Sequence, residues 1–163
     1  MPAKEAPFSL ESAGVLLKRA GLRKTIARVH LLQCLASQTG PRTQAEITAD
    51  LEPHGFDSST IFRGLTDLTS SGLVVRLDTG DRIWRFELHD RTSDGSLSTR
   101  HHSHVICNQC GRMQCLDSSF AERINPQIDG WAIEDFIFRG RCERCRTKVN
   151  ETALIDQKSD RKE

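Results

Sequence analysis

The stretch of sequence that decides the fold is residues 58–88, SSTIFRGLTDLTSSGLVVRLDTGDRIWRFEL. In its first half, apolar residues recur every three or four positions, which predicts a helix that begins at Ser58 or Ser59 and ends near Gly72. In its second half, apolar and polar residues alternate on both sides of the turn sequence DTGD (78–81), which is typical of a β-hairpin. A helix followed at once by a hairpin predicts a winged helix-turn-helix, whose last helix enters the major groove of DNA. The spacing alone leaves a generic helical domain open.

Three further helices are predicted upstream of this stretch, because apolar residues recur at helical spacing from Ser9 onward. Each of these helices has a start signal in the sequence. Ser9 precedes the first helix, Thr25 caps the second, and Thr43 and Glu46 form a capping box at the start of the third. Together with the hairpin, the helices predict a DNA-binding domain over residues 9–90.

Charge is distributed unevenly along a chain that is nearly neutral overall. The 23 Lys and Arg residues and the 22 Asp and Glu residues give a formal net charge of +1. Residues 17–30 nevertheless carry five cations and no acid, namely Lys18, Arg19, Arg23, Lys24 and Arg28. A solvated helix face more often mixes both signs, so this segment favours contacts with DNA phosphates.

The composition is that of a globular chain with one or two small domains. Of the 163 residues, 37% are hydrophobic and 28% are charged. The apolar runs are far shorter than the roughly 20 residues that span a bilayer, which excludes a membrane-spanning protein. The sequence also opens without a secretory signal, which predicts a cytoplasmic protein. In that reducing compartment, clustered cysteines more often hold metal than form disulfides.

Four of the six cysteines form two C-x-x-C pairs, Cys107–Cys110 and Cys142–Cys145, with 31 residues between the pairs. Each two-residue gap lets both sulfurs reach one ion, and two such pairs complete a tetrahedral zinc site. A closed four-sulfur site has no open position for a substrate, which predicts a structural role. A zinc nucleobase deaminase would instead combine an H-x-E motif with a single C-x-x-C, so we do not expect an enzyme.

The polar residues 91–100 are predicted to be a linker or hinge loop, and residues 101–155 a second, metal-binding domain. This half shows strand patterns at 105–107, 113–116 and 131–138 and a helical pattern at 118–128. It is too small to bury a self-sufficient core, so a zinc ion and a dimer partner would both compensate.

A cluster of histidines predicts a second metal site. His102 and His104 are two positions apart, so on a strand their imidazoles lie on one face. Other nitrogen, sulfur and oxygen donors lie nearby in the sequence, namely Glu87, His89, His101, Cys115, Glu122 and Glu134. The thiol favours zinc, whereas the carboxylates leave iron or manganese open. A histidine-rich loop without metal is the alternative.

Four motifs of the chain resemble the ferric uptake regulator family of metal-dependent bacterial repressors. They are G-L-R-x-T-x-x-R (21–28), T-I-F-R-x-L-x-x-L (60–68), R-F-E (85–87) and H-x-H-x-x-C-x-x-C-G (102–111), and the similarity runs from about Gly21 to Cys145. The resemblance implies an α+β chain with an N-terminal winged helix and a small α/β dimerisation domain. It further implies a homodimer, a structural zinc at the four cysteines and a sensing metal at the hinge between the domains.

Matched by position, the resemblance places the sensing metal at Glu87, His102, His104 and Cys115. A family histidine ligand is replaced here by Arg42, so His89 would supply the missing ligand. A possible further metal site would comprise His101, Glu122 and Glu134. The residues expected at the DNA are Arg23, Lys24, Arg28, Ser59, Thr60, Phe62 and Arg63. Among them, Arg63 would contact a base edge, Arg23 the minor groove or a phosphate, and Lys24 and Arg28 phosphates.

The sequence therefore predicts a metal-responsive repressor that binds double-stranded operator DNA. A peroxide-sensing regulator of the same fold and a zinc-stabilised interaction module without metal sensing are the alternatives. Two positions depart from the family pattern at the DNA: Phe62 stands where a Tyr is usual, and Gly64 lies inside the reading helix, at a cost of about 1 kcal/mol relative to Ala. Cys34 is expected to be a buried apolar residue rather than a ligand.

Overall fold

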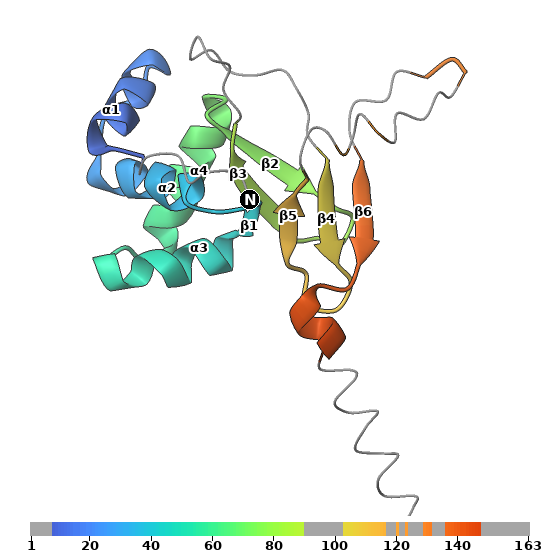
Figure 1. Cartoon of the computed structure of the whole chain (residues 1–163). Coiled ribbons are helices and arrows are strands. Elements are labelled where there is room, and N and C mark those ends of the chain that lie inside the picture. Colours follow the sequence, from blue (N-terminus) through green and yellow to red (C-terminus); the bar gives the residue numbers. More distant parts are fainter. Residues whose placement is uncertain are drawn as a thin grey trace, which may run out of the picture. The chain divides into compact units, whose positions relative to one another are not determined.

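The computed structural model describes residues 8–89, 103–116, 120, 123, 129–131 and 136–147. The chain divides into two compact units, residues 1–101 and residues 102–163 (Figure 1). The predicted linker at 91–100 lies outside the described residues. Within the described ranges, no helix is both long enough and apolar enough to cross a bilayer.

The first unit contains the four predicted helices, and its capping residues act as the sequence indicates. The helices are α1 (Leu10–Arg19), α2 (Ile26–Ala36), α3 (Gln44–Leu51) and α4 (Ser58–Ser70), with a short 3-10 helix η1 (Glu52–His54) after α3. The Ser9 side chain accepts a hydrogen bond from the Ser12 amide at 3.0 Å. Thr43 and Glu46 form the reciprocal capping box. These bonds satisfy amide groups that have no partner within the helix.

Helix α4 begins at Ser58, but its cap is the preceding residue, Asp57. The Asp57 carboxylate accepts hydrogen bonds from the Thr60 amide and the Ser59 hydroxyl, both at 2.7 Å. A carboxylate at a helix N-terminus also interacts favourably with the helix dipole. These contacts hold the pKa of Asp57 below its ordinary value. The start of the helix is therefore fixed by a charged cap that the sequence analysis did not identify.

The predicted hairpin is confirmed and belongs to a three-stranded antiparallel sheet. Its strands are β2 (Val74–Asp78) and β3 (Trp84–Leu88), and β1 (Arg42–Thr43) pairs with the other edge of β3. In the register, Arg42 is opposite Phe86 and Leu77 is opposite Arg85. Strand β1 has only two residues, too few for an alternating pattern to be visible in the sequence.

The core of the first unit lies between the helices and this sheet. Its most deeply buried apolar side chains are Ala13, Leu16, Leu17, Leu31, Leu32, Ile47, Ile61, Leu65 and Leu68. Helices α2 and α4 approach each other closely at Gly64, because a Cβ there would overlap Cδ1 of Leu31. Close packing against Leu31 thus explains why α4 has a glycine at position 64, on its core-facing side.

The second unit contains a three-stranded sheet in the order β5–β4–β6. The strands are β4 (His104–Cys107), β5 (Met113–Cys115) and β6 (Ile137–Gly140), with β4 antiparallel to β5 and parallel to β6. The strands predicted at 105–107 and 113–116 are confirmed. The strand predicted over 131–138 begins only at Ile137, since Trp131 and Phe136 are not in a strand. Phe120 and Arg123 are helical, as the helix predicted over 118–128 requires.

Candidate functional site

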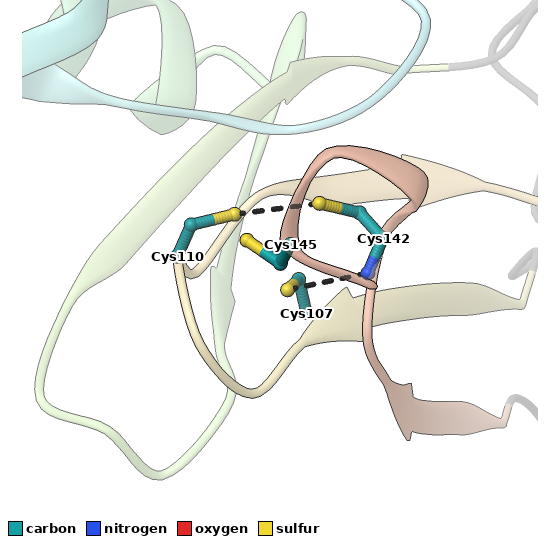
Figure 2. Close-up of side chains that lie close together, drawn as sticks. All are labelled: Cys107, Cys110, Cys142 and Cys145. Carbon is teal, nitrogen blue, oxygen red and sulfur yellow. Dashed lines mark hydrogen bonds between the residues drawn. The ribbon is translucent and has the colours of Figure 1, made fainter. Parts of the chain in front are cut away.

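The parallel pairing of β4 and β6 brings the two C-x-x-C pairs together. Cys107, the last residue of β4, is the register partner of Gly140, the last residue of β6. The Asn108 amide continues this pairing by donating a hydrogen bond to the Gly140 carbonyl at 2.8 Å. The chain then turns through Cys110 on one side and into a helical turn at 143–147 on the other. Figure 2 shows the four sulfurs converging from these two turns.

The four sulfurs have the spacing of a tetrahedral zinc site. All four Sγ atoms lie within 4.8 Å of one another. The Sγ atoms of Cys110 and Cys142 are 3.7 Å apart, and two sulfurs bound tetrahedrally at about 2.3 Å from zinc would be about 3.8 Å apart. None of the four forms a disulfide. Residues Cys107, Cys110, Cys142 and Cys145 can therefore hold one zinc ion as predicted.

The backbone around the cluster favours thiolates at one C-x-x-C pair. The amide of Cys142 donates to Sγ of Cys107 at 3.4 Å. This bond and those from the Cys110 and Gln109 amides lower the pKa of Cys107 to about 6. The Arg112 amide lowers the pKa of Cys110 in the same way. Burial, followed by the neighbouring thiols, raises the pKa of Cys145 to about 12. Zinc binds thiolates, so binding must release the Cys145 proton.

Two residues of the predicted sensing site are neighbours in the second unit. His104 on β4 is the register partner of Cys115 on β5. Directly opposite residues of an antiparallel pair have Cβ atoms about 5 Å apart, so an imidazole and a thiol lie side by side on one face of the sheet. His104 is buried and Cys115 is half-buried.

The other predicted sensing residues lie in the first unit or outside the described residues. Glu87 is a buried residue of β3. His89 follows that strand, and its Nδ1 lies 3.1 Å from the Gly72 carbonyl. Because a carbonyl only accepts, this bond requires the proton on Nδ1 and leaves Nε2 as the nitrogen that could bind a metal. The remaining predicted ligands, His101, His102, Glu122 and Glu134, lie outside the described residues.

Helix α4 carries four of the residues that are expected at the DNA. Ile61, Leu65 and Leu68 are buried on one side of the helix. On the other side, Phe62 is 56% exposed and Arg63 is also exposed. Ser59 is exposed and Thr60 half-buried in the first turn of the helix. The four residues expected at the DNA therefore lie in the first six residues of α4, the part of a recognition helix that faces the bases.

The predicted phosphate-binding cations divide into two groups. Arg23 and Lys24 are exposed in the segment before α2. Arg28 instead donates a hydrogen bond to Asp67 of α4 at 2.6 Å and another to the Arg23 carbonyl at 2.7 Å. Its guanidinium thus links α2, α4 and the segment that carries Arg23.

Comparisons with known proteins agree with this arrangement. The model of the ferric uptake regulator family matches residues 19–136. The chain belongs to the ferric uptake regulator family. The peroxide-responsive repressor PerR of Staphylococcus aureus is 32% identical over 146 residues, which cover 85% of this chain and 93% of that protein. Family members are metal-responsive transcriptional regulators, which bind operator DNA as dimers.

Solved structures of family members share the fold. The ferric uptake regulator of Pseudomonas aeruginosa with manganese is 25% identical, with a TM-score of 0.57, and the match covers 80% of this chain and 98% of that one. The ferric uptake regulator of Vibrio cholerae, whose DNA-binding domains are structurally rearranged, is 24% identical, with a TM-score of 0.57 and coverage of 79% and 98%. The α+β architecture predicted from the sequence is confirmed.

Arg42, which the resemblance places where the family has a histidine, has a structural role in this chain. Its guanidinium donates to Gln38 at 2.7 Å and to Asp50 of α3 at 3.1 Å, and it also pairs with Glu46. It thereby ties β1 to α3. Near this network, Cys34 is half-buried, and burial followed by the Asp50 charge raises its thiol pKa. A protonated, half-buried thiol agrees with the prediction that Cys34 is not a ligand.

Arg85 is buried in the hairpin, which the alternating pattern does not predict. The residue is only 1% exposed, and its guanidinium binds both carboxylate oxygens of Asp81, at 3.1 and 2.8 Å. It also donates to the Thr79 hydroxyl and to the Ile83 carbonyl. The turn sequence already contained the signal, because an acid four residues before an arginine in a tight hairpin can fold back onto it.

Proposed function

We propose that this member of the family is a cytoplasmic repressor that binds operator DNA as a homodimer when a sensing metal is bound. A winged-helix domain (9–90) would bind the DNA, a dimerisation domain (101–155) would join the subunits, and the loop 91–100 would connect them. The observation that carries the proposal is the outer side of α4, which exposes Phe62 and Arg63 beside an apolar core face.

The side chains of α4 suit the chemistry of the major groove. The Arg63 guanidinium can donate two hydrogen bonds to O6 and N7 of one guanine, which is the commonest specific contact of arginine with DNA. The exposed Phe62 ring can contact a thymine methyl group. Ser59 and Thr60, whose hydroxyl and amide donate to the capping Asp57, would lie beside the DNA in the first turn of α4. Lys24 would bind a further phosphate, and Arg23 a phosphate or the minor groove.

The four-cysteine cluster would hold a structural zinc. When bound, the ion supplies four metal–sulfur bonds that close the two turns onto each other. The chain prepares this site by donating backbone N–H groups to Cys107 and Cys110, which stabilises their thiolates. Because the second unit has a small core, the stability of its sheet would depend on this site.

The sensing metal is proposed to bind Glu87, His89, His102, His104 and Cys115, with His101, Glu122 and Glu134 as a possible further site. The pairing of His104 with Cys115 supports two members of this set. The hydrogen bond of His89 Nδ1 supports a third, because ligating histidines commonly donate their second nitrogen to a carbonyl. A thiol among imidazoles favours zinc over iron or manganese.

Metal and DNA would then be linked thermodynamically. Glu87 and His89 belong to the DNA-binding unit, whereas His104 and Cys115 belong to the second unit. An ion bound by both groups would favour one arrangement of the two units. If operator DNA favours the same arrangement, each ligand strengthens the binding of the other by the same factor.

The test is a titration of DNA binding at fixed free concentrations of zinc, iron and manganese. Duplexes selected from a random library by the zinc-loaded protein would serve as probes. We expect His104→Ala to remove the metal dependence of binding while the protein remains a dimer with its structural zinc. His54→Ala, which removes an exposed histidine of η1, is the matched control and should behave as the parent.

Three outcomes would separate the hypotheses. Unchanged metal dependence in His104→Ala would refute the sensing site. Equal loss of zinc and manganese affinity in Cys115→Ser would refute the preference for zinc. A folded, zinc-bound protein that selects no duplex would indicate the alternative, a zinc-stabilised interaction module.

A peroxide-sensing function is the second candidate, because the S. aureus protein that is 32% identical is a peroxide-responsive repressor. It predicts that the iron-loaded protein loses DNA binding on treatment with hydrogen peroxide, while the manganese-loaded protein does not. Equal resistance of both forms would exclude this function.

A further inference from the structure

The turns that carry the four cysteines also carry most of the positive charge in the described part of the second unit. In the segments 107–113 and 139–147, the cations are five exposed arginines and the only acid is Glu143. None of these arginines belongs to the proposed metal sites or to the residues expected at the DNA. We call them the arginine group: Arg112, Arg139, Arg141, Arg144 and Arg146.

The arginine group gathers around the cysteines because of the strand pairing that forms the zinc site. Arg139 and Arg141 flank Gly140, which is the register partner of Cys107. Each of the other three arginines is one or two residues from another cysteine of the cluster. Consecutive Cα atoms are about 3.8 Å apart, so every member has its Cα within about 8 Å of a cysteine or of Gly140. The five cations therefore lie at the end of the sheet where the sulfurs converge (Figure 2).

The arginines exceed the negative charge of the zinc site itself. The Arg144 guanidinium donates to the Cys110 sulfur and lies near the other thiols, and these contacts raise the pKa of Arg144. One arginine is thus engaged with the cluster. A zinc ion bound to four thiolates is doubly negative, and Glu143 adds one further negative charge. Five arginines leave a positive surplus at this end of the sheet.

The residue types suit a protein partner better than a nucleic acid. Every cation in the described part of the second unit is an arginine, and none is a lysine. Arginine is enriched and lysine depleted at protein–protein interfaces, and a guanidinium binds a carboxylate through two parallel hydrogen bonds. Ile137 is 40% exposed and lies on the same face of β6 as Arg139, because the two are two residues apart. The surface therefore offers an apolar contact beside its charges.

We propose that the arginine group binds an acidic segment of another protein, with guanidinium groups paired to Asp and Glu carboxylates. Ile137 would contact an apolar side chain of the same segment. This inference goes beyond the proposed function and does not depend on it, because no residue expected at the DNA takes part. The arginine group and the reading helix belong to different units, so they can be varied independently.

Peptide selection with the zinc-loaded full chain provides the first test. Short peptides from a random display library would be depleted on the double variant Arg112→Gln/Arg141→Gln, which loses one arginine from each turn, and then selected on the parent. We expect the selected peptides to be enriched in Asp and Glu next to apolar residues. A library with no peptide that prefers the parent, or selected peptides without this enrichment, would overturn the proposal.

Fluorescence anisotropy of a labelled selected peptide measures the contribution of each arginine. An exposed ion pair contributes up to about fivefold in affinity, so Arg112→Gln and Arg141→Gln should each weaken binding by about two- to fivefold. Arg112→Lys and Arg141→Lys should have intermediate effects, because the ammonium keeps the charge and loses the paired hydrogen bond. Arg123→Gln removes the same charge from an exposed residue of the second unit and is the matched control. Equal weakening in the control would indicate a response to net charge alone and contradict the proposal.

Binding to nucleic acid is the competing outcome. A phosphate contact contributes about 0.9 to the slope of log affinity against log salt concentration. The slope for random duplex DNA should be the same in the parent and in Arg112→Gln/Arg141→Gln. A slope reduced by about 0.9 for each arginine would assign the group to nucleic acid and overturn the proposal.

Two further measurements complete the design. Zinc content and circular dichroism of Arg112→Gln/Arg141→Gln should match the parent, because both side chains are exposed. If this variant loses zinc, the two lysine variants, which keep the charge beside the cluster, provide the comparison. A parent protein that binds the selected peptides but no duplex would count against the proposed function and leave this inference standing.

Discussion

Replacing Gly64 by alanine should destabilise the first unit, although alanine is the better helix former. On propensity alone, the change in the middle of α4 would stabilise the helix by about 1 kcal/mol. The added Cβ, however, would overlap Cδ1 of Leu31, a side chain with no exposed surface. Overpacking of a tight core costs about 1–3 kcal/mol. Because the overlap is with a fully buried methyl group, we expect the upper part of this range and a net loss of about 1–2 kcal/mol.

The prediction is measured by thermal unfolding of the zinc-loaded chain, monitored by far-ultraviolet circular dichroism. The helices of the first unit dominate this signal. A domain of this size loses about 4–8 °C in Tm for each kcal/mol. Gly14→Ala is the matched control, because Gly14 also lies inside a helix. A Cβ there would be 3.2 Å from Nζ of Lys24, the flexible end of a long side chain. Gly14→Ala should therefore raise Tm.

A double-mutant cycle identifies the cause. Leu31→Ala alone should cost about 2–5 kcal/mol, because it leaves a cavity in the core. In that background, Gly64→Ala should no longer destabilise, since its methyl group would occupy part of the vacated space. The coupling between the two positions should then be about 0.5–3 kcal/mol. If Gly64→Ala raises Tm in the parent, or costs the same with and without Leu31, the close approach of α2 and α4 does not explain this glycine.

Three further predictions concern the metal cluster and the DNA surface. Cys107→Ser should lose the bound zinc and unfold the second unit while the helical signal of the first unit remains, because zinc binding at such sites supplies on the order of 10 kcal/mol. Hydrogen exchange of the zinc-free variant would show the unfolding. Amides of the second unit that stay protected from exchange would contradict the prediction. Zinc affinity, measured by chelator competition, should fall as the pH is lowered, because zinc must displace the Cys145 proton. The affinity should fall more steeply below about pH 6, where Cys107 also becomes protonated. An affinity that does not depend on pH would argue against the release of thiol protons on binding. Arg63→Ala should weaken operator binding by about 1–3 kcal/mol and relax one base preference, whereas Lys24→Ala should weaken binding to all duplexes alike. If Arg63→Ala loses equal affinity for operator and random DNA, Arg63 contacts a phosphate instead of a base.

The features that the sequence predicts correctly are local ones. Helix starts are specified by residues three apart, as the bonds of Ser9, Thr25 and Thr43 to their helices show. The zinc site is also local in part, because each C-x-x-C pair forms its own turn. The two turns are brought together by the parallel pairing of β4 with β6, in which Cys107 is the partner of Gly140. The sequence spacing between the two C-x-x-C pairs does not specify this register.

The features that the sequence analysis missed depend on packing between elements. Alternation places Trp84 and Phe86 on one face of β3, yet Trp84 is 46% exposed and Phe86 is buried. Arg85 is more deeply buried than either, because the carboxylate of Asp81 and the Thr79 hydroxyl satisfy its guanidinium. A charged residue inside a hairpin becomes favourable only once these partners surround it, and residue type alone does not indicate that.

The cations in and before α2 differ in their surroundings. By composition it is a run of equivalent phosphate-binding residues, but Arg28 is 19% exposed and already pairs with Asp67 at 2.6 Å. Its second bond, to the Arg23 carbonyl, holds the segment that carries Arg23 and Lys24 against α4. Arg28 thus positions neighbouring cations relative to the reading helix. We therefore expect phosphate binding mainly from the exposed Arg23 and Lys24.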